Sequence, residues 1–173
     1  NMNLYCFVYN MKISYNMTIS DGDGAVSFAF TANDLAGNST TRNTVNDGTS
    51  VTYDKTAPIL STVEIVSNNA NTSYAKKDNI VTLTIASSEA LTAAPTVYLA
   101  GRLAAVATTD ATNYTATLTM NSTDTQGNIA ISIAFNDLAG NDGTPNPHTS
   151  TTNSSSVTYD REVPTLSTVT VTS

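Results

Sequence analysis

The chain has 173 residues, of which 40% are hydrophobic and only 12% are charged. This composition excludes a disordered polyelectrolyte, and no apolar run approaches the roughly 20 residues that a membrane-spanning helix needs. The formal net charge of −7 argues against nucleic acid or an anionic membrane surface as a partner, because both bind clustered Lys and Arg. The acidic side chains could instead bind hard cations.

The opening segment, 1–12, contains the single cysteine of the chain, Cys6. No disulfide can therefore form within the chain, and no cysteine-based metal site is expected. We expect Cys6 to be a small apolar filler of a core. The segment itself, "NMNLYCFVYNMK", is either a divergent strand or a segment whose sequence is poorly assigned.

An internal repeat organises the remaining sequence. "NDLAGN" occurs at 33–38 and again at 136–141, and "VTYD" follows at Val51–Asp54 and at Val157–Asp160. A shift of 103 residues aligns apolar residues at every second position before the loop, and a shift of 106 aligns the positions after it. Alternation of this kind is typical of strands with one buried face. A period of this length indicates a string of complete domains rather than a solenoid.

The central repeat contains seven candidate strands separated by turn-forming residues and has no convincing helical periodicity. They are 59–66, 80–86, 96–99, 103–107, 114–120, 129–135 and 156–159. The pattern predicts an all-β chain built from seven-stranded antiparallel β-sandwiches of the immunoglobulin or fibronectin III kind. Accordingly, we expect 1–54 to be the C-terminal part of one repeat, 55–160 a complete repeat, and 161–173 the first strand of a following repeat.

Three stretches carry a family resemblance: "SVTYDKTAPILSTVEIVSNN", "IVTLTIASSEAL" and "ISIAFNDLAGN". They resemble the bacterial-type immunoglobulin-like (Big/cadherin-like) tandem repeats of large surface adhesins and surface filament proteins. The resemblance implies an extracellular, cell-surface location. It also implies ions at the junctions between repeats, where they stiffen the array.

Acidic residues at matching places suggest where such an ion would bind. Alternating strand directions bring the loops that contain Glu89 and Asp137 to the pole where the linker carrying Asp54 enters. Three carboxylates at such a seam would repel each other unless a cation lay between them, and Ca²⁺ accepts oxygens in irregular geometry. Asn141 could add a neutral oxygen ligand.

Matching acids elsewhere extend this hypothesis. By the repeat, Asp34 would complete a preceding calcium site and Asp160 would open a following one. The alternative is that "DLAG" is simply a tight turn in which Gly140 takes a positive φ. "DGDG" at 21–24 predicts a plain turn, because it lacks the further acids of an EF-hand.

Sugars are a second candidate chemistry. Six asparagines begin an Asn-x-Ser/Thr acceptor: Asn16, Asn38, Asn71, Asn113, Asn121 and Asn153. Chance alone gives about this number in a chain so rich in Asn, Ser and Thr. Asn71, Asn113 and Asn121 are the ones we expect to be best exposed.

No catalytic pattern is present, since nucleophile elbows, phosphate loops and His-rich metal sets are all missing. His148 is predicted to be a surface residue, and we expect no enzymatic activity. The leading hypothesis is a stiff extracellular spacer whose partners are neighbouring repeats. The alternatives are a module that binds a receptor or glycan, and a filament subunit that donates a strand to an identical subunit. Tyr74 and Tyr98 are the aromatic residues that stand outside the core pattern.

Overall fold

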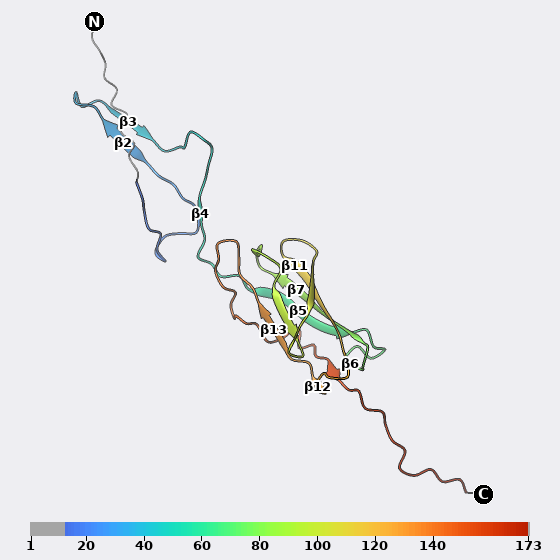
Figure 1. Cartoon of the computed structure of the whole chain (residues 1–173). Helices are drawn as coiled ribbons and strands as arrows, with labels where there is room; N and C mark the ends of the chain where they lie inside the picture. The colour runs from blue at the N-terminus through green and yellow to red at the C-terminus, as the bar shows by residue number, and fades with distance from the viewer. Residues whose placement is uncertain (1–12, 173) are drawn as a thin grey trace. The chain divides into compact units, whose positions relative to one another are not determined.

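The computed structural model describes residues 13–172, which contain β-strands and no helix (Figure 1). The predicted all-β class is confirmed. The chain divides into two compact units, of which unit 1 ends at Lys55 and unit 2 begins at Thr56. The predictions for Cys6 and for the segment 1–12 lie outside the described residues. None of the described segments forms an apolar helix long enough to cross a membrane.

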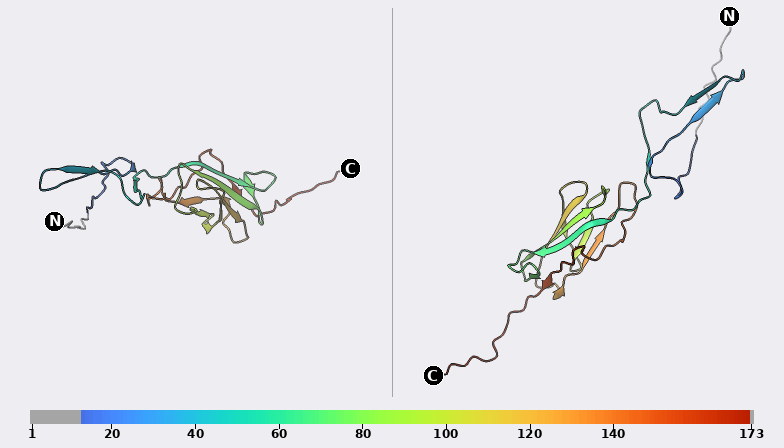
Figure 2. Two further views of the ribbon diagram at one scale, coloured as in Figure 1. Left: turned by 90° about the horizontal axis from the view of Figure 1, so that it is seen from above. Right: turned by 180° about the vertical axis from the view of Figure 1, so that it is seen from behind.

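The largest sheet of unit 2 has four antiparallel strands in the order β10-β11-β7-β5. Its members are β5 (Leu60–Ser67), β7 (Ile80–Ser87), β10 (Ala105–Thr108) and β11 (Asn113–Thr119). Figures 1 and 2 show the long strands β5 and β7 side by side from every direction drawn. Buried side chains alternate along β7, so one face of the strand lies in the core, whereas the other is exposed or half-buried.

Strand β5 departs from strict alternation at its start. The register against β7 shifts between Leu60 and Thr62, which is the signature of a β-bulge. Because the bulge adds one residue, the buried side chains of Leu60, Val63 and Ile65 are spaced by three residues and then by two.

Two smaller sheets complete unit 2. One has the order β13-β8-β9 and is antiparallel, with β8 (Thr96–Leu99), β9 (Arg102–Leu103) and β13 (Ile131–Ala134). The other has the order β12-β14-β6, and in it β14 pairs with β6 in the parallel sense. Its members are β6 (Tyr74–Ala75), β12 (Gly127–Asn128) and β14 (Thr158–Tyr159).

A single buried cluster joins the sheets of unit 2. The four-stranded sheet contributes Val63, Leu83 and Ile85, and the β13-β8-β9 sheet contributes Val97, Leu99 and Ile133, all 3% exposed or less. Burial of aliphatic side chains contributes roughly 1.5–3 kcal/mol each, so this cluster is the main source of stability for unit 2.

Residues 161–172 follow the last strand of unit 2 and form no strand themselves. Their apolar side chains are exposed to solvent: Val163, Leu166, Val169 and Val171.

In its described part, residues 13–55, unit 1 has four short strands in two antiparallel pairs. The first pair is β1 (Gly24–Ala25) with β4 (Thr52–Tyr53), and the second is β2 (Phe30–Asn33) with β3 (Ser39–Arg42). Most large apolar side chains among residues 13–55 are exposed. These described residues of unit 1 therefore form little of the kind of buried core that stabilises unit 2.

The two units nevertheless end with the same contacts. In each, a tyrosine hydroxyl donates to the carbonyl at the start of a turn, and an aspartate carboxylate accepts from the amide of that same residue. The contacts are Tyr53 Oη to Thr18 O (2.8 Å) with Thr18 N to Asp21 Oδ2 (2.7 Å), and Tyr159 Oη to Asn121 O (2.7 Å) with Asn121 N to Asp124 Oδ2 (2.7 Å). The observed turn spans Thr18–Asp21 and is built like its counterpart at Asn121–Asp124, whereas the turn was predicted at 21–24, where Gly24 already belongs to β1.

Candidate metal centre

The loop after β13 is a tight turn organised by the side chain of Asp137. Its carboxylate accepts hydrogen bonds from the amide of Asn141 (2.8 Å) and from the side-chain Nδ2 of Asn141 (2.8 Å). Gly140 donates its amide to the Asp137 carbonyl at 3.3 Å and has a φ of 93°, a region that favours glycine. The predicted tight turn with a positive φ at Gly140 is confirmed.

The same loop forms in unit 1 with the same bonds. The Asp34 carboxylate accepts from the amide of Asn38 at 2.9 Å and from its Nδ2 at 2.8 Å, and Gly37 has a φ of 88°. Since the loop recurs where little core surrounds it, its geometry is a local property of the sequence "NDLAGN".

The loop between β7 and β8 lies beside the Asp137 loop, as alternating strand directions predicted. Leu91 forms an antiparallel bridge with Asp137, and the amide of Thr92 donates to the carbonyl of Asn136 at 3.1 Å. The Thr92 hydroxyl donates to the carbonyl of Asp137. These contacts hold Glu89, in the same loop, close to Asp137.

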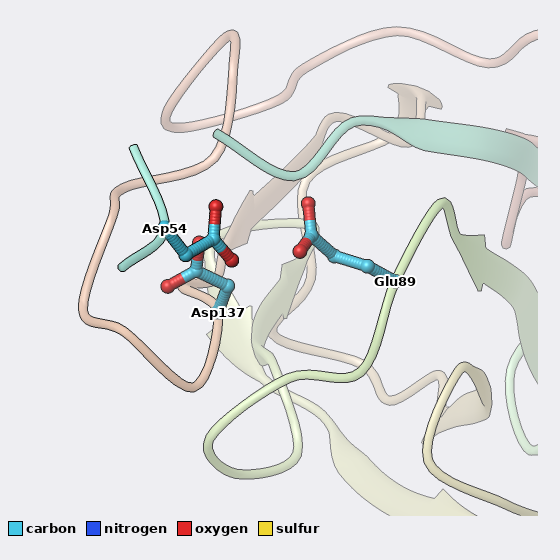
Figure 3. Close-up of side chains that lie close together, drawn as sticks. All are labelled: Asp54, Glu89 and Asp137. Carbon is cyan, nitrogen blue, oxygen red and sulfur yellow. The ribbon is translucent and has the colours of Figure 1, made fainter. Parts of the chain in front are cut away.

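The structure brings the three predicted carboxylates together (Figure 3). One carboxylate oxygen from each of Asp54, Glu89 and Asp137 lies within 4.8 Å of the others. Asp54 stands in the segment that leads into Thr56, and Figure 3 shows Glu89 pointing towards the two aspartates. Calcium–oxygen distances of about 2.3–2.6 Å allow two ligand atoms of one ion to be up to about 5 Å apart, so the spacing of these oxygens fits Ca²⁺.

Electrostatics favour the charged form of Asp137. Burial acts to raise its pKa, but the hydrogen bonds from the side chain and backbone of Asn141, with those from the amides of Gly140 and Ala139, outweigh burial. The pKa of Asp137 therefore lies below its ordinary value of 3.8. A carboxylate that is 1% exposed and ionised at neutral pH is the form that a divalent cation binds.

The other predicted ligands have different surroundings from the three carboxylates. Asn141 supports Asp137 through Nδ2, so only its amide oxygen could serve as a ligand. Asp34 and Asp160 are exposed, and within residues 13–172 neither belongs to a group of three potential metal ligands.

The six glycosylation candidates differ in accessibility. The expectation that Asn121 is among the best exposed is wrong, because Asn121 is half-buried next to a buried turn residue, Asp124. The other five are exposed: Asn16, Asn38, Asn71, Asn113 and Asn153. The amide nitrogen of Asn113 donates to Asp110 at 3.0 Å, and that of Asn38 donates to Asp34, so modification of either would break a hydrogen bond.

The prediction of a surface position for His148 is wrong. His148 is 8% exposed, and its backbone pairs with Ile133 in an antiparallel bridge. Residues opposite each other in such a bridge point to the same face, and Ile133 points into the core. Neither ring nitrogen has a hydrogen-bond partner.

Sequence reasoning also missed a buried ion pair. The Asp124 carboxylate accepts from Nη1 of Arg102 at 2.9 and 3.1 Å, and the side chain of Asp124 is 1% exposed. The repeat marks Asp124, which matches Asp21, but no sequence pattern links it to Arg102, so only the fold shows this pair.

No protein-family model, no curated protein and no solved structure matches this chain.

Proposed function

We propose that the chain is a structural part of an extracellular, cell-surface protein made of tandem immunoglobulin-like β-sandwiches, in which it acts as a stiff spacer. The observation that carries this proposal is the repetition of local structure. The Asp-Asn loop and the tyrosine-capped turn recur in both units with the same atoms bonded. A chain that repeats its loops and turns in series has the organisation of a domain array.

The sandwich topology is the finer part of the proposal. Support comes from the four-stranded sheet and the β13-β8-β9 sheet, which share one buried cluster. Two mainly antiparallel sheets that enclose a common core are the defining feature of that architecture.

Calcium is the proposed stiffening element. Asp54 lies in the segment that enters unit 2, whereas Glu89 and Asp137 belong to loops within unit 2. An ion held by all three carboxylates would tie this segment to the domain that follows it. Binding would also relieve the repulsion between three negative charges placed close together.

Thermal unfolding of the whole chain with Ca²⁺ and with a chelator tests this role. Since an ion that binds only the folded state stabilises it by about 2.7 kcal/mol at a hundredfold excess over its Kd, the melting temperature of unit 2 should rise by several degrees. Glu89→Gln should abolish the rise, because it removes a carboxylate without changing shape. Asp54→Asn should reduce it and return mobility to the entering segment.

Glu64→Gln is the matched control, since Glu64 is exposed on β5 and belongs to no acidic group among the described residues. It should keep the full calcium response. Identical melting curves with Ca²⁺ and with chelator would remove the ion from the proposal. Equal losses in the Glu64 and Glu89 variants would show that bulk charge, rather than this site, is responsible.

A further inference from the structure

Strand β10 forms one edge of the four-stranded sheet of unit 2. All four of its residues pair with β11, and the pair that follows, Thr109 with Asn113, is joined by a hydrogen bond from the Thr109 amide to the Asn113 carbonyl at 2.9 Å. Hydrogen-bonded and non-bonded pairs alternate along an antiparallel ladder. The amides and carbonyls of Val106 and Thr108 therefore point away from β11.

The outward side of β10 meets another strand only where β10 begins. Ala104, the residue before β10, donates its amide to the Val97 carbonyl of β8 at 2.9 Å. Beyond that point, no strand, bridge or backbone hydrogen bond of residues 13–172 involves the outward groups of Val106 and Thr108. Backbone donors and acceptors on alternate residues thus form an unpaired edge in the middle of a complete unit.

The opposite edge of the same sheet, β5, is protected. The Val63 amide donates to Thr152 Oγ1, and the Thr152 amide donates back to the Val63 carbonyl, both at 2.9 Å. β5 also contains a bulge and a charged residue, Glu64. Covering loops, bulges and charges are the usual means by which proteins prevent pairing between sheet edges. The register of β10 has no bulge, and the segment 103–109 has no charged residue.

We infer that the edge of β10 pairs with β10 of a second copy of this chain, in the antiparallel sense and about a two-fold axis at Ala107. Val106 of each copy then lies opposite Thr108 of the other. Each of these residues donates its amide to the residue opposite and accepts from it in return, so the four outward amides of the two copies all find a carbonyl. The two sheets of four strands become one continuous sheet.

Charge favours a second copy in this orientation. A copy that carries a net charge of −7 would be repelled by an acidic edge, but the nearest charged residues along the chain are Arg102 before β10 and Asp110 after it. Antiparallel pairing brings the Arg102 end of one strand to the Asp110 end of the other, whereas parallel pairing would bring like charges together. Ala107 is exposed and small, so it can face its own counterpart at the axis. The edge is therefore complementary to itself.

The contact is short, so we expect a weak dimer that forms at high protein concentration. It is also isologous, so it closes at a pair of copies. The dimer depends on neither Ca²⁺ nor the spacer role, since the acidic group of Asp54, Glu89 and Asp137 includes no residue of β10. Measurements in chelator therefore separate this inference from the proposed function.

Sedimentation velocity and amide hydrogen exchange of the whole chain, over a wide concentration range in chelator, test the inference. We expect a monomer–dimer equilibrium in which the amides of Val106 and Thr108 gain protection as the concentration rises. The amides of Ala105 and Ala107 are the internal reference. They donate to β11 within one copy and should be protected at every concentration.

Two substitutions should weaken the dimer. Thr108→Pro removes an outward donor and keeps the pairing with β11, in which the Thr108 amide takes no part. It should weaken association at least about tenfold, because each copy loses one donor at the interface. Ala107→Lys places like charges opposite each other at the axis and should weaken association severalfold. Thr84→Lys is the matched control, since Thr84 is exposed and stands in the same cross-strand row as Ala107, two strands from the edge. It should leave association unchanged.

A mixture of the Ala107→Lys and Ala107→Glu proteins gives the decisive measurement. Each protein alone should associate poorly, because β10 then meets its own charge. The mixture should form a heterodimer at least as tight as the unsubstituted dimer, because opposite charges then meet at the axis. Slow exchange of the β7 amides should persist in every variant, which shows that unit 2 is still folded.

Three results would overturn the inference: a chain that stays monomeric at every concentration, a mixture that does not recover association, and full association of Thr108→Pro. Equal loss in Thr84→Lys would show that charge on the whole sheet face, rather than the edge, controls association. Protection of the Val106 and Thr108 amides in the dilute monomer would show that another segment of the same chain covers β10, and that outcome also refutes the second-copy contact.

Discussion

Unit 1 and unit 2 contain the same loops and turns but differ in what covers them. Val51 and Val157 occupy the same position of the repeat, yet Val51 is 67% exposed and Val157 is fully buried. Asp34 and Asp137 make the same hydrogen bonds to their asparagines, yet only Asp137 is buried. The conformation of the loops and turns is therefore determined by short sequence motifs, whereas stability depends on the strands that enclose them. The comparison separates these two contributions within one chain.

The largest expected difference concerns the matched aspartates Asp21 and Asp124. Asp124→Ala removes the buried acceptor of Arg102 and leaves the amide of Asn121 without its partner, which should lower the free energy of unfolding of unit 2 by about 3 kcal/mol. Asp21→Ala should have a much smaller effect, because Asp21 lies in an exposed turn and its hydrogen bonds can be replaced by water.

Urea unfolding followed by amide hydrogen exchange of the whole chain measures both substitutions, since exchange reports on each unit separately. Arg102→Gln is the second variant. It should lower the free energy of unfolding of unit 2 by less than Asp124→Ala does, because the Arg102 side chain is 40% exposed. Equal losses for the two aspartate variants would mean that the turn, and not the buried ion pair, stabilises unit 2.

Much of the fold could be predicted from the alternation of apolar and polar residues along the sequence. The strands β5, β7, β8 and β11 lie within one residue of their predicted limits, because each has a buried apolar face that the sequence displays. The predicted strand 103–107 is in fact two strands. β9 pairs with β8 and β10 pairs with β11, so the chain changes sheets at Ala104.

The features that the sequence does not predict depend on contacts between residues that are far apart in the chain. β6 has two residues and pairs with β14 in parallel, which leaves no periodic signal. The polar, proline-rich neighbours of His148 indicate a surface position, whereas its burial follows from pairing with Ile133. The acidic group was predictable because the repeat marked Asp54 and Asp137 and alternating strand direction brought Glu89 towards them.

The next largest expected difference is between Val157→Ala and Val51→Ala, which remove the same atoms at matched positions of the repeat. Val157→Ala removes two methyl-sized groups from a closed core and should cost about 2 kcal/mol, the sum of a lost transfer free energy and a cavity. Val51→Ala should cost about 0.5 kcal/mol or less, because solvent already reaches that side chain.

Chemical denaturation of the two valine variants decides this point, with slow-exchanging amides of β11 and β13 as the readout for unit 2. A large loss for Val51→Ala would indicate that unit 1 has its own closed core in solution. That result would contradict the exposure of its apolar side chains.

The smallest expected effect concerns the pKa values of aspartate carboxyl groups. These values show how strongly local hydrogen bonds lower a pKa when the carboxyl group is not buried. Asp110, in the exposed turn before β11, accepts from the amide of Thr112 (2.8 Å) and from the side chain of Asn113 (3.0 Å), which lowers its pKa to about 2. The pKa values of Asp34 and Asp137 are also below 3.8. A pKa lowered on folding stabilises the folded state above the ordinary value, and this stabilisation is lost as the pH falls through the folded value.

Carboxyl chemical shifts recorded by NMR between pH 6 and pH 1.5, in chelator, measure these pKa values directly. Asp110 should titrate near pH 2, and Asp34 and Asp137 should both titrate below 3.8 despite their different burial. Asn38→Ala and Asn141→Ala each remove the side-chain donor and should raise the pKa of their aspartates. If Asp137 titrated above 3.8 while Asp34 stayed below it, desolvation would outweigh the loop, and the site would need its cation to keep Asp137 ionised.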